Sequence, residues 1–398
     1  MSDKYISHHK KVTGFSFANL GFFTGFAGSI IGAVYSLVLL DIFGDPALVG
    51  MYVSFYFALM AFITIFASEV FKRFAKAPLL HTSLLIVALS YFMMAFPIAA
   101  PTFITIDLVS GAFQVMLGLL VPLFMADFAH GVGMEKLNAR RWFFVNLGAL
   151  TAPIIALSVA SEFGIRTPFF LSAALYFMAL FVFTKMRIKQ QTKKFTTIRA
   201  RRTLKSVWIN IILFFRRKSF IRAYIVMFSD FSLVVIRTIY VPIMVVQNNT
   251  TLFGLSIEQT LGVLITLMII PYIVLAQPAG RLAKKYGKKI ILSTAFLIYG
   301  MFALWASFAD GYTLLAIFVL WHLAGAFIEP MRDLPFFDAA KKAERIRFMG
   351  IYRTATSTSR IIVPMLAAAL IFASGSTSVV LLLAGAVAIF AGLFVLKK

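Results

Sequence analysis

A long uncharged run in the second half of the chain predicts a helix that spans a membrane. It reads LGVLITLMIIPYIVLAQPA over residues 261–279, and the basic sequence GRLAKKYGKK follows directly over residues 280–289. An apolar run of about twenty residues can cross the roughly 30 Å of hydrocarbon in a bilayer. Lysine and arginine collect on the cytoplasmic side of membrane proteins. We therefore expect a span that ends in a basic cytoplasmic turn.

The chain also carries an internal duplication. A segment that lies 212 positions earlier in the chain aligns with the uncharged run without a gap. Asp127 lies 26 residues before Pro153, and Asp338 lies 26 residues before Pro364, which is an offset of 211 for both pairs. Internal repeats in a membrane chain are the signature of transporter folds whose halves rock about a shared site. The period therefore predicts two related halves.

The composition is typical of a protein that lies almost wholly in a bilayer. Hydrophobic residues make up 61% of the 398 residues, charged residues make up 13%, and the mean hydropathy is +0.92. The absence of cysteine excludes a disulfide framework and thiol chemistry. We predict an all-α membrane protein with twelve transmembrane helices in two pseudo-symmetric six-helix bundles. The predicted spans are 14–41, 48–68, 78–98, 102–127, 142–161, 167–186, 220–246, 259–280, 289–308, 312–333, 348–373 and 377–396.

Alternate loops differ in charge, and this difference predicts the orientation. One set of loops is rich in lysine and arginine, whereas the other set holds most of the acidic loop residues. By the positive-inside rule both termini are cytoplasmic, in a plasma (cytoplasmic) membrane. The net charge of +23 is then a topology signal and a source of attraction to anionic membrane lipids. We expect no nucleic-acid partner.

The longest connection joins the two predicted halves. Residues 185–222 hold thirteen lysines and arginines and no acidic residue. Within them, Val207–Phe215 is apolar with Trp208 near its start, which is typical of a helix that lies in the membrane interface. We predict an N-terminal six-helix bundle over residues 1–186, a basic cytoplasmic linker over residues 187–218 and a C-terminal six-helix bundle over residues 219–398.

The basic turn resembles the best-known motif of the major facilitator superfamily, roughly G-x-L-A-D-R-x-G-R-K. Lys284 stands where the family usually has aspartate, and the matching positions are Gly280, Leu282, Ala283, Lys285, Gly287, Lys288 and Lys289. The glycines permit a tight turn, and the cations can bond the carbonyls at a helix C-terminus. The pattern therefore indicates a hinge and latch. We assign gating to Gly280, Lys284, Lys285, Gly287, Lys288, Arg332 and Asp333.

Ionisable residues inside predicted spans are costly unless they face a cavity or a partner. Asp230 and Arg237 lie seven residues apart, and so do His322 and Glu329, so the members of each pair project from almost the same helix face. A carboxylic acid deep in a membrane favours its neutral form and can load and release a proton as access alternates. We predict that Asp230 and Glu329 couple transport to protons, with His322 as a relay.

The resemblance implies that spans one, four, seven and ten line a central cavity, with two, five, eight and eleven at its flanks. A charged C-terminal wall would then face an N-terminal wall of weaker polarity. Such a cavity suits an amphipathic or charged organic solute, whose carboxylate or phosphate the arginines could hold. The predicted substrate-binding residues are Asn19, Asp107, Gln114, Asn146, Arg237 and Arg360.

Each of these charges also has a structural interpretation. Asp230 and Arg360 could form a structural ion pair, and His322 could be a packing histidine. Glu329, Arg332 and Asp333 lie near the cytoplasmic end of their span, where a gate latch is as reasonable as contact with a ligand.

The remaining classes of function find little support in the sequence. There is no HExxH pattern, no GxSxG and no phosphate-binding glycine loop joined to a soluble domain, so we expect no enzyme and no ATP-driven pump. We predict a monomeric secondary active transporter that works by alternating access. It would use a proton gradient and no cofactor. Export of drug-like or lipid-like compounds and transport of an anionic metabolite both remain open. The alternative is a non-transporting sensor on a transporter fold.

Overall fold

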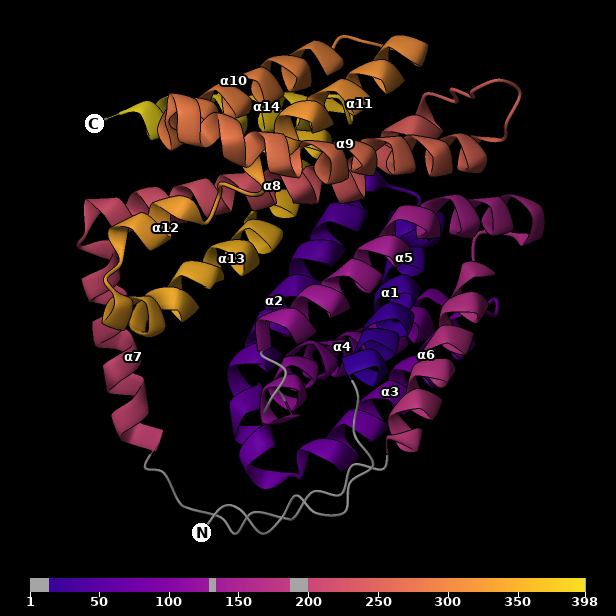
Figure 1. Ribbon diagram of the computed structural model, residues 1–398. Helices are drawn as coiled ribbons and strands as arrows, with labels where there is room; N and C mark the ends of the chain where they lie inside the picture. The colour runs from indigo at the N-terminus through magenta and orange to yellow at the C-terminus, as the bar shows by residue number, and fades with distance from the viewer. Residues whose placement is uncertain (1–13, 129–133, 187–199, 398) are drawn as a thin grey trace. The chain divides into compact units, whose positions relative to one another are not determined.

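The computed structural model describes residues 14–128, 134–186 and 200–397 (Figure 1). In these residues the regular structure is helical, as the apolar runs predict. Six helices make up the first repeat: α1 (Gly14–Phe43), α2 (Pro46–Arg73), α3 (Lys76–Met94), α4 (Ala100–Phe128), α5 (Met134–Phe163) and α6 (Pro168–Lys185).

The second repeat contains six long helices in the same order. They are α8 (Lys218–Gln247), α9 (Ile257–Tyr286), α10 (Lys288–Ala306), α11 (Gly311–Ile328), α13 (Lys342–Ser374) and α14 (Val379–Leu396). Lys288, which begins α10, follows Lys76, which begins α3, by 212 positions, and each of these two helices has 19 residues. The period in the sequence is therefore also a period of helix boundaries.

Length and apolarity identify the helices that can cross a membrane. Among the described residues, eleven helices meet both conditions, and α5 contributes a shorter apolar stretch over residues 147–163. The first turns of α5 read MEKLNARR, and its apolar sequence follows them. Each of the twelve predicted spans overlaps a helix. The span predicted over residues 312–333 was too long, because α11 ends at Ile328 and residues 329–333 form a turn.

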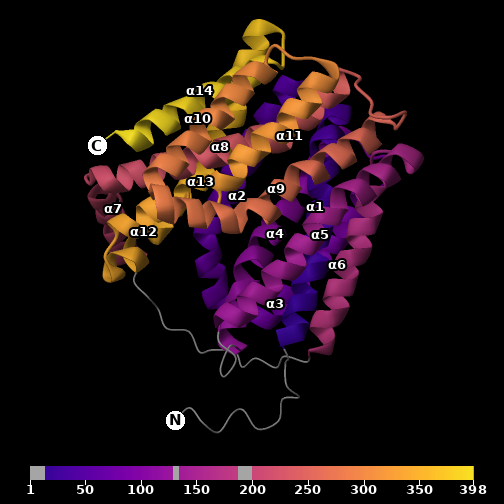
Figure 2. The ribbon, with the colours of Figure 1, turned by 45° about the horizontal axis from the view of Figure 1, so that its top comes forward.

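Close packing between helices follows the small residues. In each repeat the third helix packs against the fourth and the sixth: α3 against α4 and α6, and α10 against α11 and α14. Figures 1 and 2 both show α10, α11 and α14 side by side. Gly300 of α10 lies against the backbone of α14, and the Ser293 hydroxyl donates to the Gly392 carbonyl over 2.7 Å. Glycine and serine let these two helices approach closely in an environment with little hydrophobic driving force.

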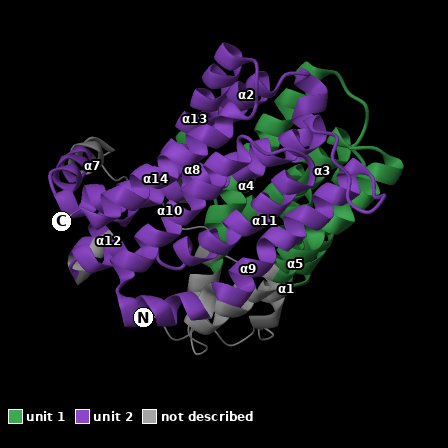
Figure 3. Cartoon of the chain, turned by 90° about the horizontal axis from the view of Figure 1, so that it is seen from above, with its two compact units in different colours: residues 1–34, 60–195 green, residues 35–59, 196–398 purple. Residues whose placement is uncertain are grey.

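The chain divides into two compact units, which Figure 3 distinguishes by colour. The first comprises residues 1–34 and 60–195, and the second comprises residues 35–59 and 196–398. The second unit thus includes the end of α1 and the start of α2. There the Tyr240 hydroxyl donates to the Pro364 carbonyl over 3.2 Å and lies against Gly50. The predicted domain boundaries at residues 186 and 218 stay predictions.

Two further helices belong to the second unit. The predicted interfacial helix is present as α7 (Ala200–Phe215), with Trp208, Ile209, Ile212 and Phe215 exposed. On another side of α7, Phe214 is fully buried and stacks on Phe220 with ring centroids 5.1 Å apart. Its location in a membrane interface stays a prediction.

The second additional helix, α12 (Leu334–Ala339), was not predicted. Its first turn contains a proline. Proline suits this position because the first N–H groups of a helix have no partner within the helix, and proline has no N–H. Phe336 of α12 stacks on Tyr352 of α13 at 4.5 Å. These two side chains belong to a buried cluster of aromatic and aliphatic residues that joins α7, α8, α12 and α13: Phe214, Phe220, Ala223, Met227, Phe336, Ala340, Phe348, Tyr352 and Ala355.

Candidate substrate and coupling site

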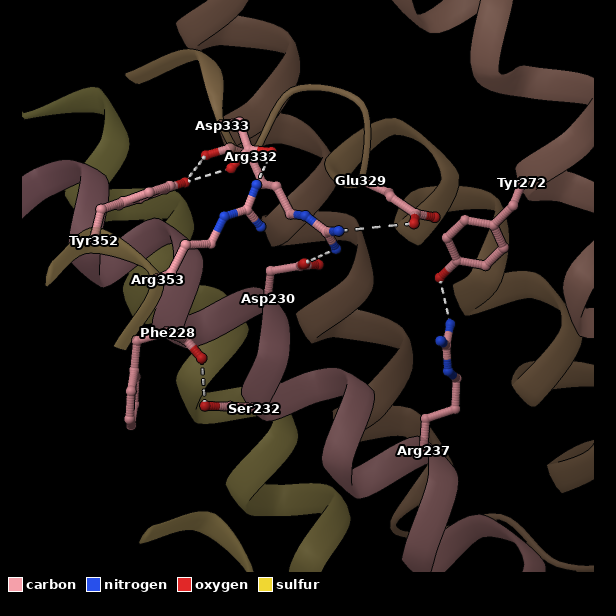
Figure 4. Close-up of polar contacts among 10 residues, drawn as sticks. All are labelled: Phe228, Asp230, Ser232, Arg237, Tyr272, Glu329, Arg332, Asp333, Tyr352 and Arg353. Atoms are coloured by element: carbon pink, nitrogen blue, oxygen red, sulfur yellow. Dashed lines mark hydrogen bonds and ion pairs between the residues drawn. The ribbon is translucent and has the colours of Figure 1, made fainter. Parts of the chain in front are cut away.

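Charged and aromatic side chains of the second unit converge near the end of α11 (Figure 4). Asp230 and Arg237 come from α8, and Tyr272 comes from α9. Glu329 caps the C-terminus of α11 and precedes Pro330, and a proline disfavours continuation of the helix before it. The chain therefore turns here and brings Arg332 back toward α8.

An ion pair between Asp230 and Arg332 lies at the centre of this group. The Arg332 Nη1 atom donates to the Asp230 Oδ2 atom over 2.7 Å, and Asp230 is 6% exposed. The guanidinium also lies 4.8 Å from the centre of the Phe231 ring. Glu329 is farther away, with 3.9 Å between its Oε1 atom and Arg332 Nη2, and half of its side chain is exposed. The partner of Asp230 is thus Arg332, and the alternative of an ion pair with Arg360 was wrong.

Arg237 has a neutral partner instead. Its Nη1 atom donates to the Tyr272 hydroxyl over 2.7 Å, and its guanidinium lies 5.3 Å from the centre of the same ring. In the described part of the chain, no carboxylate lies within ion-pairing distance of Arg237. The cation is held by one hydrogen bond and the face of one aromatic ring.

Within the described ranges, the partners of Arg360 of α13 are aromatic faces. Its guanidinium lies 5.1 Å from the centre of the Phe57 ring and 5.8 Å from that of Phe231, both within the second unit. Contacts of this kind contribute about 2 kcal/mol when they are desolvated. They do not neutralise the charge. Two of the three arginines around Phe231 and Tyr272 therefore lack a carboxylate partner among the described residues.

His322 of α11 is 1% exposed and lies between aromatic rings. Its Nδ1 atom is 2.5 Å from the Phe318 carbonyl oxygen, and because a carbonyl only accepts, Nδ1 carries the hydrogen. Its Nε2 atom is buried without a hydrogen-bond partner in the described structure. The Tyr272 ring lies 5.9 Å away. This histidine neighbours the site through Tyr272, and its relay role stays a prediction.

Two sets of polar contacts involve predicted gating residues. In the first, the Tyr352 hydroxyl lies 2.9 Å from Asp333 Oδ1, and Arg353 Nη2 lies 3.4 Å from Asp333 Oδ2. These bonds fasten the turn after α11 to α13. In the second, Lys288 Nζ is 3.0 Å from both carboxylate oxygens of Asp338 and fastens α10 to α12.

The basic turn lies between α9 and α10. Gly287 has φ +95°, a conformation that side chains disfavour, and it separates the two helices. Gly280 lies inside α9, away from the turn. Lys284 and Lys285 occupy the last turn of α9, where cations interact favourably with the helix carbonyls. Their gating role stays a prediction.

The predicted substrate-binding residues of the first repeat belong to the first unit. Gln114 Nε2 donates to the Tyr91 hydroxyl over 2.8 Å and to Ser110 over 3.0 Å, which ties α4 to α3. Asp107 is 2% exposed, and Asn19 is half-buried on α1. The side chain of Asn146 lies outside the described residues. Their role in binding stays a prediction.

Sequence reasoning missed the aromatic side chains that hold the arginines. Tyr272 carries the one hydroxyl within LMIIPYIVL, and a lone polar group in an apolar run could have signalled its role. Phe57 and Phe231 gave no such signal, because phenylalanine is abundant throughout the chain.

Comparison with known proteins gives a consistent result. Residues 17–257 and 226–398 each match the family model of the Major Facilitator Superfamily. A comparison with curated proteins found no match.

Solved structures give the same fold. A POT-family peptide transporter is 14% identical, with a TM-score of 0.79 over 98% of this chain and 94% of that one. The nucleoside transporter NupG is 15% identical, with a TM-score of 0.78 over 96% of this chain and 100% of that one. A POT-family transporter in complex with 5-aminolevulinic acid is 13% identical, with a TM-score of 0.76 over 98% and 96%.

The matches extend over both repeats, and the all-α membrane fold predicted from the sequence is confirmed. The chain belongs to the major facilitator superfamily and is a multi-pass membrane transporter, not an enzyme.

Proposed function

We propose that this transporter moves a small organic solute with an anionic group together with a proton, by alternating access. Both termini would face the cytoplasm, across a plasma (cytoplasmic) membrane. The observation that carries the proposal is the ion pair of Asp230 with Arg332 beside Arg237 and Arg360, whose described partners are neutral.

The charge balance favours an anionic solute. The site holds three arginines, and the one carboxylate buried with them, Asp230, neutralises Arg332. A cation that is buried without a counter-ion is costly, and a bound carboxylate or phosphate would supply the missing charge through charge-assisted hydrogen bonds. POT-family structures with a similar fold were solved in complex with 5-aminolevulinic acid and with sulfate. These ligands suggest probes and do not identify the substrate.

The ion pair supplies a route to proton coupling. Protonation of Asp230 removes its charge and frees the Arg332 guanidinium, which can then bind the anionic group of the solute or turn to Glu329. Loss of that proton restores the ion pair and displaces the solute. Proton and anion therefore favour each other's binding, and a linkage of this kind is reciprocal. This is the behaviour of a symporter.

The test is uptake into proteoliposomes that contain the purified transporter. The probes are 5-aminolevulinic acid, a dipeptide and a nucleoside, with and without a pH gradient that is acidic outside. We expect accumulation of an anion-bearing probe that follows the gradient. Asp230→Asn should keep exchange of the probe across the membrane and lose its gradient-driven accumulation.

Substitutions of Arg237 test recognition of the solute separately from proton coupling. Arg237→Gln should weaken binding of an anionic probe at least tenfold, and Arg237→Lys should retain part of the affinity because it keeps the charge. Unchanged gradient-driven uptake by Asp230→Asn would refute the coupling. Equilibrium binding of a probe with no flux in any condition would indicate the sensor instead of a transporter.

A further inference from the structure

A second candidate site lies in the second unit, at the end predicted to face the cytoplasm. A cavity of about 260 Å³ opens between the first turns of α8 and α10, the helix α12 and the end of α14. Its polar lining consists of Ser219, Arg222, Lys288, Lys289 and Asp338. The rest of the lining is an apolar wall that includes Val226, Leu292, Met331 and Val395. The cavity therefore combines cations with an apolar wall.

The charges of the lining are only partly compensated. Three cations and one carboxylate leave an excess of two positive charges. Asp338 is already bound to Lys288, with both oxygens 3.0 Å from the Nζ atom. The Arg222 Nε atom is buried and has no hydrogen-bond partner in the described structure. Arg222 and Lys289 are thus available to an anion.

The backbone adds to the preference for an anion. Ser219 lies in the first turn of α8, and Lys288 and Lys289 lie in the first turn of α10. Neither helix has a side-chain cap at its N-terminus, so its first N–H groups carry uncompensated positive partial charge. Phosphate is the anion that suits a guanidinium, an ammonium and helix N-termini together.

We propose that this cavity binds the phosphate of an anionic phospholipid, with Arg222 and Lys289 as the principal contacts. The apolar wall would take the glycerol and the start of the acyl chains. Basic pockets between helices on the cytoplasmic side of membrane proteins recognise lipid head groups in this way. The ligand is thus a phosphate group that carries an apolar body.

The cavity is distinct from the arginine site and adjoins it in sequence. Met331 and Leu334 line the cavity, and Arg332 and Asp333 lie between them. Arg332 holds Asp230, and Asp333 holds Tyr352. A lipid bound against Met331 and Leu334 would stabilise the turn that positions both ion-pairing residues. The lipid content of the membrane would therefore regulate the transporter.

The test compares thermal stability in nanodiscs of two compositions. Phosphatidylglycerol should raise Tm by about 2 °C or more relative to phosphatidylcholine, because a ligand of the native state stabilises it. Arg222→Gln/Lys289→Gln should lose this rise. The control Arg216→Gln/Lys185→Gln removes the same charge at exposed positions outside the cavity, and it should keep the rise.

A second variant and a second ligand keep the test decisive if the double variant is poorly folded. Ala339→Leu fills the cavity and leaves every cation in place, so it should also lose the response to phosphatidylglycerol. Inorganic phosphate in phosphatidylcholine nanodiscs should stabilise the protein less than the lipid does. Full stabilisation by inorganic phosphate would overturn the assignment to a lipid. An equal response from wild type, Arg222→Gln/Lys289→Gln and Ala339→Leu would overturn the site itself.

Discussion

Asp230 and Arg332 stabilise the protein only as a pair. Each is mostly buried, with 9% and 18% of its side chain exposed, so the loss of one partner leaves a charged group in a poorly solvated position. Loss of both partners leaves neither charge. The cost of the double substitution should therefore be smaller than the sum of the two single ones.

This reasoning gives a prediction about stability. Asp230→Asn and Arg332→Gln should each lower the free energy of unfolding by about 3 kcal/mol, whereas Asp230→Asn/Arg332→Gln should recover at least half of the summed loss. Chemical unfolding in detergent micelles measures this. Asp338→Asn is the matched control, since Asp338 forms an exposed ion pair, and it should cost about 1 kcal/mol or less. Additive effects of the two buried substitutions would show that the ion pair contributes nothing.

At the same scale, the sequence predicted which residues are charged within spans but not which residues meet. The spacing of seven residues placed Asp230 and Arg237 on one face of α8, and the structure agrees. The partner Arg332 depends on the turn after Pro330, and the spacing within one helix contains no information about a turn in another. Arg360 is equally cationic, so composition alone could not exclude it as the partner.

Among the contacts between helix ends, Glu344 in the first turn of α13 connects α13 to the start of α8. The Lys341 backbone N–H donates to Glu344 Oε2 over 3.0 Å, and Arg217 at the start of α8 pairs with Oε1 over 2.6 Å. The Lys341 N–H, and after it the Arg217 guanidinium, hold the pKa of Glu344 below its usual value. The charged carboxylate thus fastens the start of α13 to the start of α8.

A prediction about pH follows from the direction of this shift. A lowered pKa means that the stabilisation is present above the ordinary glutamate pKa of about 4.3 and is lost as the pH falls through the lower value of the folded state. Hydrogen exchange over residues 342–348, corrected for its intrinsic pH dependence, should therefore be slow at pH 7 and faster below pH 4. Glu344→Gln should be fast at both values. The exposed Glu162, at the end of α5, serves as the control, and Glu162→Gln should leave the exchange of α13 unchanged.

The contact between α10 and α14 gives a second prediction at this scale. A Cβ atom on Gly300 would lie 2.7 Å from Ile389 Cγ1 and 3.1 Å from the Gly385 carbonyl oxygen, so Gly300→Ala must separate the helices. We expect a loss of about 1–3 kcal/mol in unfolding free energy. Gly350→Ala in α13 meets no atom within 4 Å and should be neutral or slightly stabilising. Equal effects of the two substitutions would contradict the packing argument.

Long apolar runs and basic turns were sufficient to predict the membrane helices. The short helix α12 was not predicted, because its six residues, LPFFDA, are too few for periodicity to distinguish them from the end of a span. Its burial of Phe336 depends on Tyr352 and Phe220, which lie on other helices. The aromatic cluster is thus a tertiary property that the sequence does not display.

Across the whole molecule, the two repeats share helix boundaries but not chemistry. The ion pair of Asp230 with Arg332 and the arginines that lack carboxylate partners all belong to the second repeat, whereas Gln114 of the first repeat bonds to neutral groups. A duplicated fold supplies the symmetry that alternating access requires. The divergence of the two repeats then places this ion pair and these arginines in one unit. Under the proposed function, the proton and the anion would bind to that unit.

This asymmetry predicts the electrical behaviour of transport. If one proton on Asp230 accompanies each solute of charge −1, the cycle moves no net charge, and a membrane potential should not change the initial rate of uptake. Proteoliposomes with a potassium gradient and valinomycin measure this at constant pH, with an N-acetylated dipeptide as a probe of net charge −1. In Asp230→Asn the proton is lost and the solute carries its charge alone, so a potential that is positive inside should accelerate its net uptake. Wild-type uptake that follows the potential as steeply as that of Asp230→Asn would mean that the ion pair does not carry the coupled proton. Arg237→Lys serves as the control, because it keeps Asp230 and all cations and should remain insensitive to the potential even where its affinity falls.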